Sequence, residues 1–186
     1  MEQPVPTNDA RAGRWLDASA LSPLAPSTRA WLTWPRMLTA AVRASCRDAF
    51  ALDVIGERSC TLRADERVLL GVGDATAHER EILMRDGDEA LLYARTLVPA
   101  TTLARQPWLS ELGDAPLGEA LAARTGDGAR DGFRFQPVAS DWPLLGAGAP
   151  VPMQDAWARS SVVRVAGAPL AIIEVFLPAL HQRPAP

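Results

Sequence analysis

The most apolar part of the chain reads Ala171-Ile172-Ile173-Glu174-Val175-Phe176-Leu177-Pro178, with one carboxylate at its centre. The run is short, rich in β-branched and aromatic residues, and lies between Gly167 and a proline, which predicts a β-strand. Because side chains alternate along a strand, Glu174 shares a face with Ile172 and Phe176. We therefore expect its carboxylate to be partly or wholly buried, with a cationic or hydrogen-bonding partner or a bound proton. An edge strand with Glu174 facing water is the alternative interpretation.

Two tight turns predict how the strands pair. Residues 156–165 and 169–177 flank Ala166-Gly167-Ala168, and residues 76–85 and 89–98 flank Asp86-Gly87-Asp88. Glycine in such a turn supplies a positive φ at little steric cost. Strands joined by tight turns pair antiparallel, because a parallel link needs a long crossover. Further strands are predicted within 50–56, 59–72 and 132–138.

Helical patterns precede the predicted sheet and interrupt it. They cover residues 27–32, 36–47 and 101–112, and a short helix begins near Pro116. The predicted fold class is therefore α+β, an antiparallel sheet of about six strands with inserted helices. We expect residues 1–26 to form a loosely ordered arm, 27–180 a single domain and 181–186 a disordered tail, with a loop at 139–152.

The composition excludes several kinds of chemistry. All 19 basic residues are arginine, so a Schiff-base lysine, a P-loop lysine and a lysine general base are absent. Two histidines and two scattered cysteines do not form a recognisable zinc site. The net charge of −3 gives no sign of a nucleic-acid partner, and no apolar run approaches the roughly 20 residues that span a bilayer. The first residues lack the pattern of a secretory signal, so we expect a cytoplasmic protein without membrane insertion.

Three arginines lie inside predicted strands, where a charge is costly unless it has a partner. Arg80 shares a face with Ile82 and Met84, and it either points at an anionic ligand or belongs to an exposed charged run at the start of its strand. Arg95 and Arg159 either bind a ligand or form a salt bridge with Glu174. Three such arginines and one glutamate suit a small ligand that carries carboxylates and a hydroxyl, but the residues alone do not identify it.

The same residues lie in segments that resemble the chorismate pyruvate-lyase family. The resemblance holds in order and spacing from about residue 27 to about residue 179. It rests on these segments: Trp31-Leu32, Met37-Leu38-Thr39, Arg80-Glu81-Ile82-Leu83, Ala94-Arg95-Thr96-Leu97-Val98-Pro99, Pro116-Leu117-Gly118, Trp157-Ala158-Arg159-Ser160, Pro169-Leu170 and Glu174-Val175-Phe176-Leu177-Pro178.

The resemblance implies a function and a site. Members of this family convert chorismate to 4-hydroxybenzoate and pyruvate, the first committed step of ubiquinone biosynthesis, without a metal or cofactor. Their ligand is buried between a six-stranded antiparallel sheet and two helical flaps. By resemblance, Arg80 binds the ligand carboxylate and Glu174 meets the ring hydroxyl, and both are the expected catalytic residues. Leu38 and Leu117 are expected to contact the ligand from the two flaps.

The remaining arginines are secondary candidates: Arg95 or Arg159 is expected to help neutralise the second carboxylate of chorismate. We expect a monomer from which the buried product leaves slowly, so that 4-hydroxybenzoate inhibits the reaction. Two alternatives stay open. One is a non-enzymatic sensor of aromatic carboxylates, because effector domains of some transcription regulators have a similar fold. The other is a lyase that makes a different hydroxybenzoate.

Overall fold

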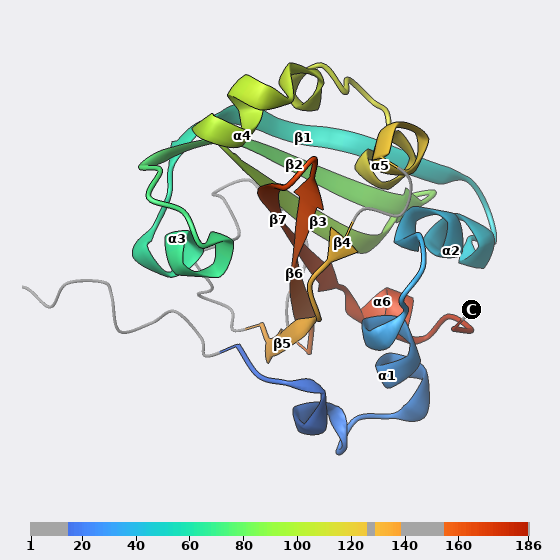
Figure 1. Ribbon diagram of the computed structural model, residues 1–186. Helices are drawn as coiled ribbons and strands as arrows, with labels where there is room; N and C mark the ends of the chain where they lie inside the picture. Colours follow the sequence, from blue (N-terminus) through green and yellow to red (C-terminus); the bar gives the residue numbers. More distant parts are fainter. Residues whose placement is uncertain (1–14, 126–128, 139–154, 186) are drawn as a thin grey trace, which may run out of the picture.

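The computed structural model describes residues 15–125, 129–138 and 155–185. Within these residues, seven strands form one antiparallel sheet in the order β1-β2-β3-β7-β6-β4, and β5 also pairs with β6 (Figure 1). The strands are β1 (Phe50–Thr61), β2 (Thr76–Asp86), β3 (Glu89–Pro99), β4 (Ala129–Arg130), β5 (Arg134–Pro137), β6 (Trp157–Val165) and β7 (Ala168–Phe176).

Helices precede the sheet, interrupt it and follow it, so the predicted α+β class is confirmed. The α-helices are α1 (Pro26–Thr33), α2 (Leu38–Ser45), α3 (Ala64–Leu70), α4 (Ala100–Arg105), α5 (Leu117–Thr125) and α6 (Pro178–His181). The 3₁₀ turns are η2 (Ala18–Leu21) and η3 (Pro107–Ser110). In the described part of the chain, no helix is both long and apolar enough to cross a bilayer.

Both predicted hairpins are confirmed. Strand β2 pairs with β3 beside Gly87, and β6 pairs with β7 through Ala166 and Gly167. Gly87 and Gly167 have φ values of 59° and 81°, in the region that glycine reaches without steric cost. The long strand β7 lies between β3 and β6, so the alternative of an edge strand for Glu174 is wrong.

One predicted strand is a helix. Residues 59–72 were expected to hold a strand, but β1 ends at Thr61 and α3 follows. The carboxylate of Glu66 accepts a hydrogen bond of 2.8 Å from the backbone N–H of Arg63, and Gly71 ends the helix with a φ of 66°. These are start and stop signals of a helix, and they override the apolar content of the segment.

The helix predicted over 101–112 is also interrupted, because α4 ends at Arg105 and η3 begins at Pro107. Proline lacks the N–H that would continue the helix.

Helices cover the sheet on both faces. Figure 1 shows α2, α5, α1 and α6 on one side of the central strands and α3 on the other. Apolar residues of α1, α2 and α6 pack on the first face, including Trp31, Val42 and Leu180. On the second face, Leu70 of α3 packs with residues such as Tyr93 and Ile173. The core therefore has two halves, separated by the sheet.

The end of the chain, expected from its composition to be a disordered tail, packs against the sheet as far as residue 185. Arg183 is buried; its guanidinium lies 2.9 Å from Asp86 and also pairs with Glu89. The indole N–H of Trp31 donates to the carbonyl oxygen of Arg183 over 3.2 Å. At the other end, Leu16 pairs with Phe135 of β5. The predicted loop at 139–152 lies outside the described residues, and the division at 26 and 180 stays a prediction.

Candidate functional site

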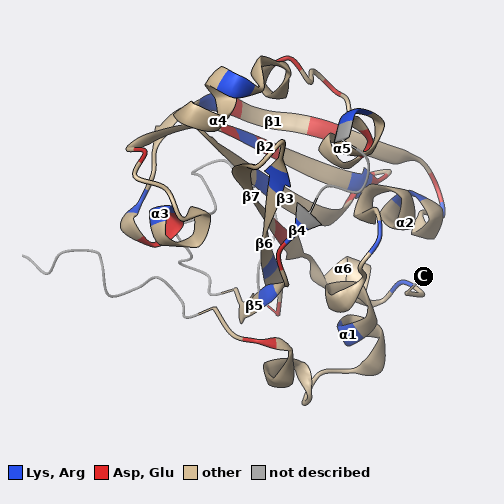
Figure 2. Cartoon of the chain, viewed as in Figure 1, with Lys and Arg blue, Asp and Glu red and all other residues tan. Residues whose placement is uncertain are grey.

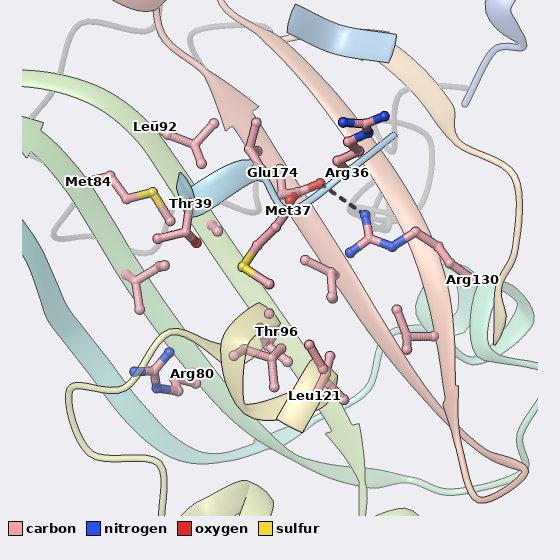
Figure 3. A pocket seen from close by; sticks show the side chains of 18 of the residues that line it. Arg36, Met37, Thr39, Arg80, Met84, Leu92, Thr96, Leu121, Arg130 and Glu174 are labelled. Carbon is pink, nitrogen blue, oxygen red and sulfur yellow. Dashed lines mark ion pairs between the residues drawn. The ribbon is translucent and has the colours of Figure 1, made fainter. Parts of the chain in front are cut away.

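A cavity of about 580 Å³ lies between one face of the sheet and the beginnings of α2 and α5 (Figure 3). The strands contribute Arg80, Ile82, Met84, Leu92, Ala94, Thr96, Arg130, Val163, Ile172 and Glu174. The helical side contributes Pro35, Arg36, Met37, Leu38, Thr39, Leu117, Gly118, Leu121 and Ala122. Most of these lining residues are apolar, and charged side chains lie among them at separate places.

Strand pairing places Arg80 and Glu174 on the same face of the sheet. Ala94 of β3 is opposite both Ile82 and Glu174, while Thr96 is opposite Arg80. Glu174 is thus two strands from Arg80 and two residues along. With about 4.8 Å between strands and about 6.8 Å for two residues, their Cα atoms lie roughly 12 Å apart. Figure 3 shows the two side chains at separate ends of the cavity.

Glu174 is buried and has a cationic partner, as expected. The Nε of Arg159 donates to its Oε2 over 2.5 Å, and the two residues are opposite each other in β6 and β7. Burial disfavours a charge on this carboxylate, but the guanidinium of Arg159, with a contribution from Arg130, holds the pKa of Glu174 below its usual range. The carboxylate is therefore ionised at neutral pH and is available as a hydrogen-bond acceptor.

Arg159 supports Glu174 from behind and does not line the cavity. Its side chain is fully buried, and Nη1 donates to the carbonyl oxygens of Leu32 and Trp34 over 3.1 and 2.8 Å. The centres of the Phe133 and Phe176 rings lie 4.2 and 5.1 Å from its guanidinium carbon. These contacts hold the guanidinium still, so Arg159 positions the carboxylate of Glu174.

Arg80 is a buried cation that forms no ion pair with another described residue. It is 3% exposed, and Nη2 donates to the carbonyl oxygens of Gly113 and Ala115 over 2.7 and 3.3 Å. In the part of the chain that the structure describes, no carboxylate pairs with Arg80, and its Nε has no hydrogen-bond partner. Burial lowers the pKa of Arg80. A ligand carboxylate in the cavity would supply the missing charge.

The structure does not bring Arg95 into the cavity. Arg95 lies on the other face of the sheet, where it pairs with Glu66 of α3 over 2.5 Å and with Glu79. Figure 2 shows that α3 carries both acidic and basic residues. A bulge between Met84 and Arg85 shifts the pairing of β2 and β3 by one residue, so that Arg80 is opposite Thr96. Without this shift, Arg95 would be opposite Arg80 and would lie on the same face of the sheet. A one-residue shift in register moves every side chain of a strand to the other face.

Leu38 and Leu117 both line the cavity and are the first residues of α2 and α5. The first N–H groups of a helix have no acceptor within the helix, so both starts offer backbone donors near the cavity. The two helices also approach each other. A Cβ on Gly118 would lie 3.5 Å from Cγ of Met37, and Arg43 of α2 forms an exposed ion pair of 3.4 Å with Glu119 of α5.

The sequence did not single out two charged residues of the cavity, Arg36 and Arg130. Nη1 of Arg130 lies 4.0 Å from Oε2 of Glu174, and the side chain is 29% exposed. Burial lowers the pKa of Arg130, attraction to Glu174 opposes this, and repulsion from Arg159 adds to it. Strand β4 has only two residues, too few for an alternating pattern, so no periodicity marked Arg130.

The cavity therefore suits one kind of ligand. The apolar residues of its lining fit a flat ring, Arg80 can bind an anion at one end, and ionised Glu174 can accept a hydrogen bond at the other. Among the described residues, His, Cys, Asp and Glu form no group of three that could hold a metal ion.

Comparisons with known proteins identify relatives of this chain. The family model described as Chorismate lyase matches residues 10–185. Curated proteins named "Probable chorismate pyruvate-lyase" are similar. The one from Thiobacillus denitrificans is 37% identical over 84% of this chain and 86% of its own length. The one from Ralstonia nicotianae is 35% identical over 87% and 88%. For the one from Pseudoalteromonas translucida, 33% identical, the match covers 58% of this chain and 59% of that protein.

Among solved structures, a transcriptional regulator of the GntR family from Bacillus cereus has a similar fold. The TM-score is 0.54 at 13% identity, over 70% of this chain and 92% of that chain. At this identity the likeness concerns the fold alone.

Proposed function

The chain belongs to the chorismate lyase family, and from this premise we propose that its cavity converts chorismate to 4-hydroxybenzoate and pyruvate. It is a carbon–oxygen lyase, and the reaction is the first committed step of ubiquinone biosynthesis in this family. The observation that carries the assignment to this cavity is the separation of its charges. A buried Arg80, which forms no ion pair with the other described residues, lies at one end and an ionised Glu174 at the other.

The substrate has groups that match both ends. Chorismate carries a carboxylate on its ring, a hydroxyl on the opposite ring carbon, and an enolpyruvyl ether on the carbon beside the hydroxyl. In the reaction the ether bond between ring carbon and oxygen breaks, and the hydroxyl-bearing carbon loses its hydrogen as the ring becomes aromatic. The released enolpyruvate gains a hydrogen on its methylene carbon and becomes pyruvate, so the atoms balance without a co-reactant.

Arg80 binds the ring carboxylate in this proposal. Its guanidinium is buried and fixed by the carbonyl oxygens of Gly113 and Ala115, so little ordering is needed when the anion binds. Glu174 accepts a hydrogen bond from the ring hydroxyl, and Arg159 fixes the direction of that carboxylate. Both catalytic residues are mounted on strands in the middle of the sheet, where their separation is held by backbone pairing.

Much of the rate enhancement comes from orientation and from exclusion of water. Holding a reactant in a reactive geometry contributes on the order of 7–11 kcal/mol in well-positioned systems. The starts of α2 and α5, with Leu38 and Leu117, cover the cavity and act as the two flaps. They move apart for the substrate to enter and for the product to leave.

Incubation of the purified protein with chorismate tests the function directly. We expect 4-hydroxybenzoate, identified by absorbance and chromatography, together with pyruvate. Arg80→Met should abolish detectable binding of 4-hydroxybenzoate, while Arg105→Met, which removes an exposed arginine at the end of α4, should not. Formation of 3-hydroxybenzoate instead would assign a different lyase activity. Tight binding of 4-hydroxybenzoate without turnover of chorismate would favour a sensor.

The role of Glu174 is tested by Glu174→Gln, which keeps the shape of the side chain. If Glu174 transfers a proton, as we expect of an ionised carboxylate beside the reacting carbon, kcat should fall by about 10²–10⁴-fold. Circular dichroism should show that the variant is folded. A weaker affinity for 4-hydroxybenzoate with kcat nearly unchanged would contradict proton transfer and leave a positioning role.

We also propose that the protein acts in the cytoplasm as a monomer on small molecules. Gel filtration with light scattering at micromolar concentration should give the mass of one chain, 20.0 kDa. A stable mass of two chains would contradict this.

A further inference from the structure

We propose that Arg130 binds the enolpyruvyl carboxylate of chorismate, so that the cavity distinguishes the substrate, with two carboxylates, from its aromatic product, with one. This inference rests on the proposed function. It assigns a second anion-binding position to a residue on the short strand β4, at the opposite end of the cavity from Arg80.

The position of Arg130 matches the place expected for the enolpyruvyl carboxylate of the substrate. With the ring hydroxyl at Glu174, the enolpyruvyl ether is on the neighbouring ring carbon, so its carboxylate lies near the same end of the cavity. Arg130 lines this cavity, and its Nη1 is 4.0 Å from Oε2 of Glu174. Figure 3 shows the guanidinium of Arg130 directed toward Glu174. An anion beside Glu174 is therefore within reach of Arg130.

The charges around Glu174 leave Arg130 available for an anion. Glu174 already has a close partner, because Arg159 donates to it over 2.5 Å from a fully buried position. The longer distance of 4.0 Å to Arg130 is not a hydrogen bond. Arg36 lines the same cavity, and in the described part of the chain no carboxylate pairs with it. One carboxylate thus faces more than one cation, and a second anion is favoured.

Three other arginines of the strands β2, β3 and β6 do not fit this role. Arg95 is on the opposite face of the sheet, held by Glu66 and Glu79. Arg159 has its Nε and Nη1 engaged by Glu174 and by the carbonyl oxygens of Leu32 and Trp34. Arg80 lies at the carboxylate end of the ring. Arg130 is the strand residue that is both in the cavity and next to the reacting ether.

The partial exposure of Arg130 also fits binding of the pyruvate part of the substrate, which leaves the cavity before 4-hydroxybenzoate. After the ether bond breaks, pyruvate carries away the carboxylate that Arg130 holds, whereas 4-hydroxybenzoate keeps its contacts with Arg80 and Glu174. An arginine near the solvent is suited to release a small anion, because water competes for its hydrogen bonds. 4-Hydroxybenzoate has no second carboxylate for Arg130 to bind, so the same arginine contributes little to the affinity for this product.

The test compares substrate and product in Arg130→Met, with Arg164→Met as the matched control. Arg164 is on β6 opposite Ala129, but its side chain is 45% exposed and it does not line the cavity. We expect kcat/KM for chorismate to fall by about 10- to 100-fold in Arg130→Met, the loss typical of a hydrogen bond to a charged group. The Kd of 4-hydroxybenzoate should change by less than about threefold. Arg130→Lys should recover part of kcat/KM. Measurement near pH 8 keeps Glu174 ionised in every variant.

Three results overturn the inference. They are an unchanged kcat/KM in Arg130→Met, an equal loss of affinity for chorismate and 4-hydroxybenzoate, or the same loss in Arg164→Met. An equal loss would mean that Arg130 acts through Glu174 or through the fold. Absence of chorismate turnover by the unmodified protein is a different failure: it rejects the proposed function, and this inference with it.

Discussion

Single residues in this protein show how a charge is kept inside an apolar sheet. Glu174 lies in the most apolar strand, yet it is ionised. Arg159, directly opposite it on the neighbouring strand β6, pairs with its carboxylate. An unpaired charge at this depth would be very costly. Arg80 is the converse case: the fold buries a cation that forms no ion pair with another described residue, and in the proposed function the ligand carboxylate supplies its counter-ion.

The pH dependence of activity should reveal the Arg159–Glu174 pair. In the proposed function, ionised Glu174 accepts a hydrogen bond from the ring hydroxyl, so we expect activity to be lost as the pH falls through the pKa of Glu174. Arg159 lowers that pKa, and therefore Arg159→Gln should move the acid limb of kcat/KM to higher pH. Arg159→Lys should move it back in part. The substrate titrates identically in all three proteins, so an unchanged acid limb would show that Arg159 does not control Glu174.

The same pair links stability to pH. The pKa of Glu174 is depressed in the folded state, so its contribution to stability is present above the ordinary pKa of a glutamate, and is lost as the pH falls through the lowered value.

Arg95 should be important for stability and unimportant for ligand binding. In Arg95→Met the buried carboxylates of Glu66 and Glu79 lose a partner, which typically costs about 3–5 kcal/mol in free energy of unfolding. Urea denaturation measures this cost. The Kd of 4-hydroxybenzoate, measured where the variant is still folded, should stay as in the unmodified protein. Arg85→Met, which breaks a partly exposed pair with Asp53, should lower the free energy of unfolding much less than Arg95→Met.

At the scale of elements, the proposed flaps are α2 and α5, which contribute residues to the cavity lining. Met37, the residue before α2, lies close to Gly118 of α5, and the ion pair between Arg43 and Glu119 joins the exposed surfaces of the two helices. A product enclosed beneath them leaves only after they separate. Release of 4-hydroxybenzoate, not chemistry, is therefore expected to limit turnover.

Pre-steady-state kinetics should show a burst of 4-hydroxybenzoate equal to the enzyme concentration, followed by a slower steady rate. Arg43→Ala should raise the steady rate by at most about fivefold, because an exposed ion pair contributes about 0–1 kcal/mol. The amplitude of the burst should not change. A linear time course from the first turnover would contradict limiting release.

The helix α3 shows why some elements resist prediction from sequence. The apolar residues in and around α3 fit a strand as well as a helix. The segment is too short for its periodicity to distinguish the two. What decides is the hydrogen bond from the N–H of Arg63 to Glu66, together with the turn at Gly71. Glu66 in turn binds Arg95 of β3, so the helix is fixed by a charge from a distant strand.

For the whole molecule, ligand binding and folding are coupled because the ligand fills the space between sheet and helices. A ligand at 100 times its Kd stabilises the folded state by about 2.7 kcal/mol. For a chain of this size, that corresponds to a rise in Tm of about 5–11 °C. We expect a rise of this order with 4-hydroxybenzoate in thermal denaturation. The rise should be absent in Arg80→Met and present in Arg105→Met; equal shifts in both variants would place the ligand elsewhere.

Much of this architecture follows from local patterns in the chain. The hairpin turns at Gly87 and Gly167, the alternation along the strands and the depth of Glu174 all depend on neighbouring residues, and they establish an antiparallel α+β fold. The expected candidates Arg80, Glu174, Leu38 and Leu117 do line one cavity. Their roles toward the substrate stay predictions for the experiments above.

Which arginines share that cavity depends on the tertiary structure. The bulge between Met84 and Arg85 puts Arg95 on the face opposite Arg80, and β4 brings Arg130 beside Glu174 from a segment without any periodic pattern. Alternation assigns residues of one strand to two faces, but it does not say which faces of two strands coincide. That is set by the backbone register between the strands, which a single extra residue reverses.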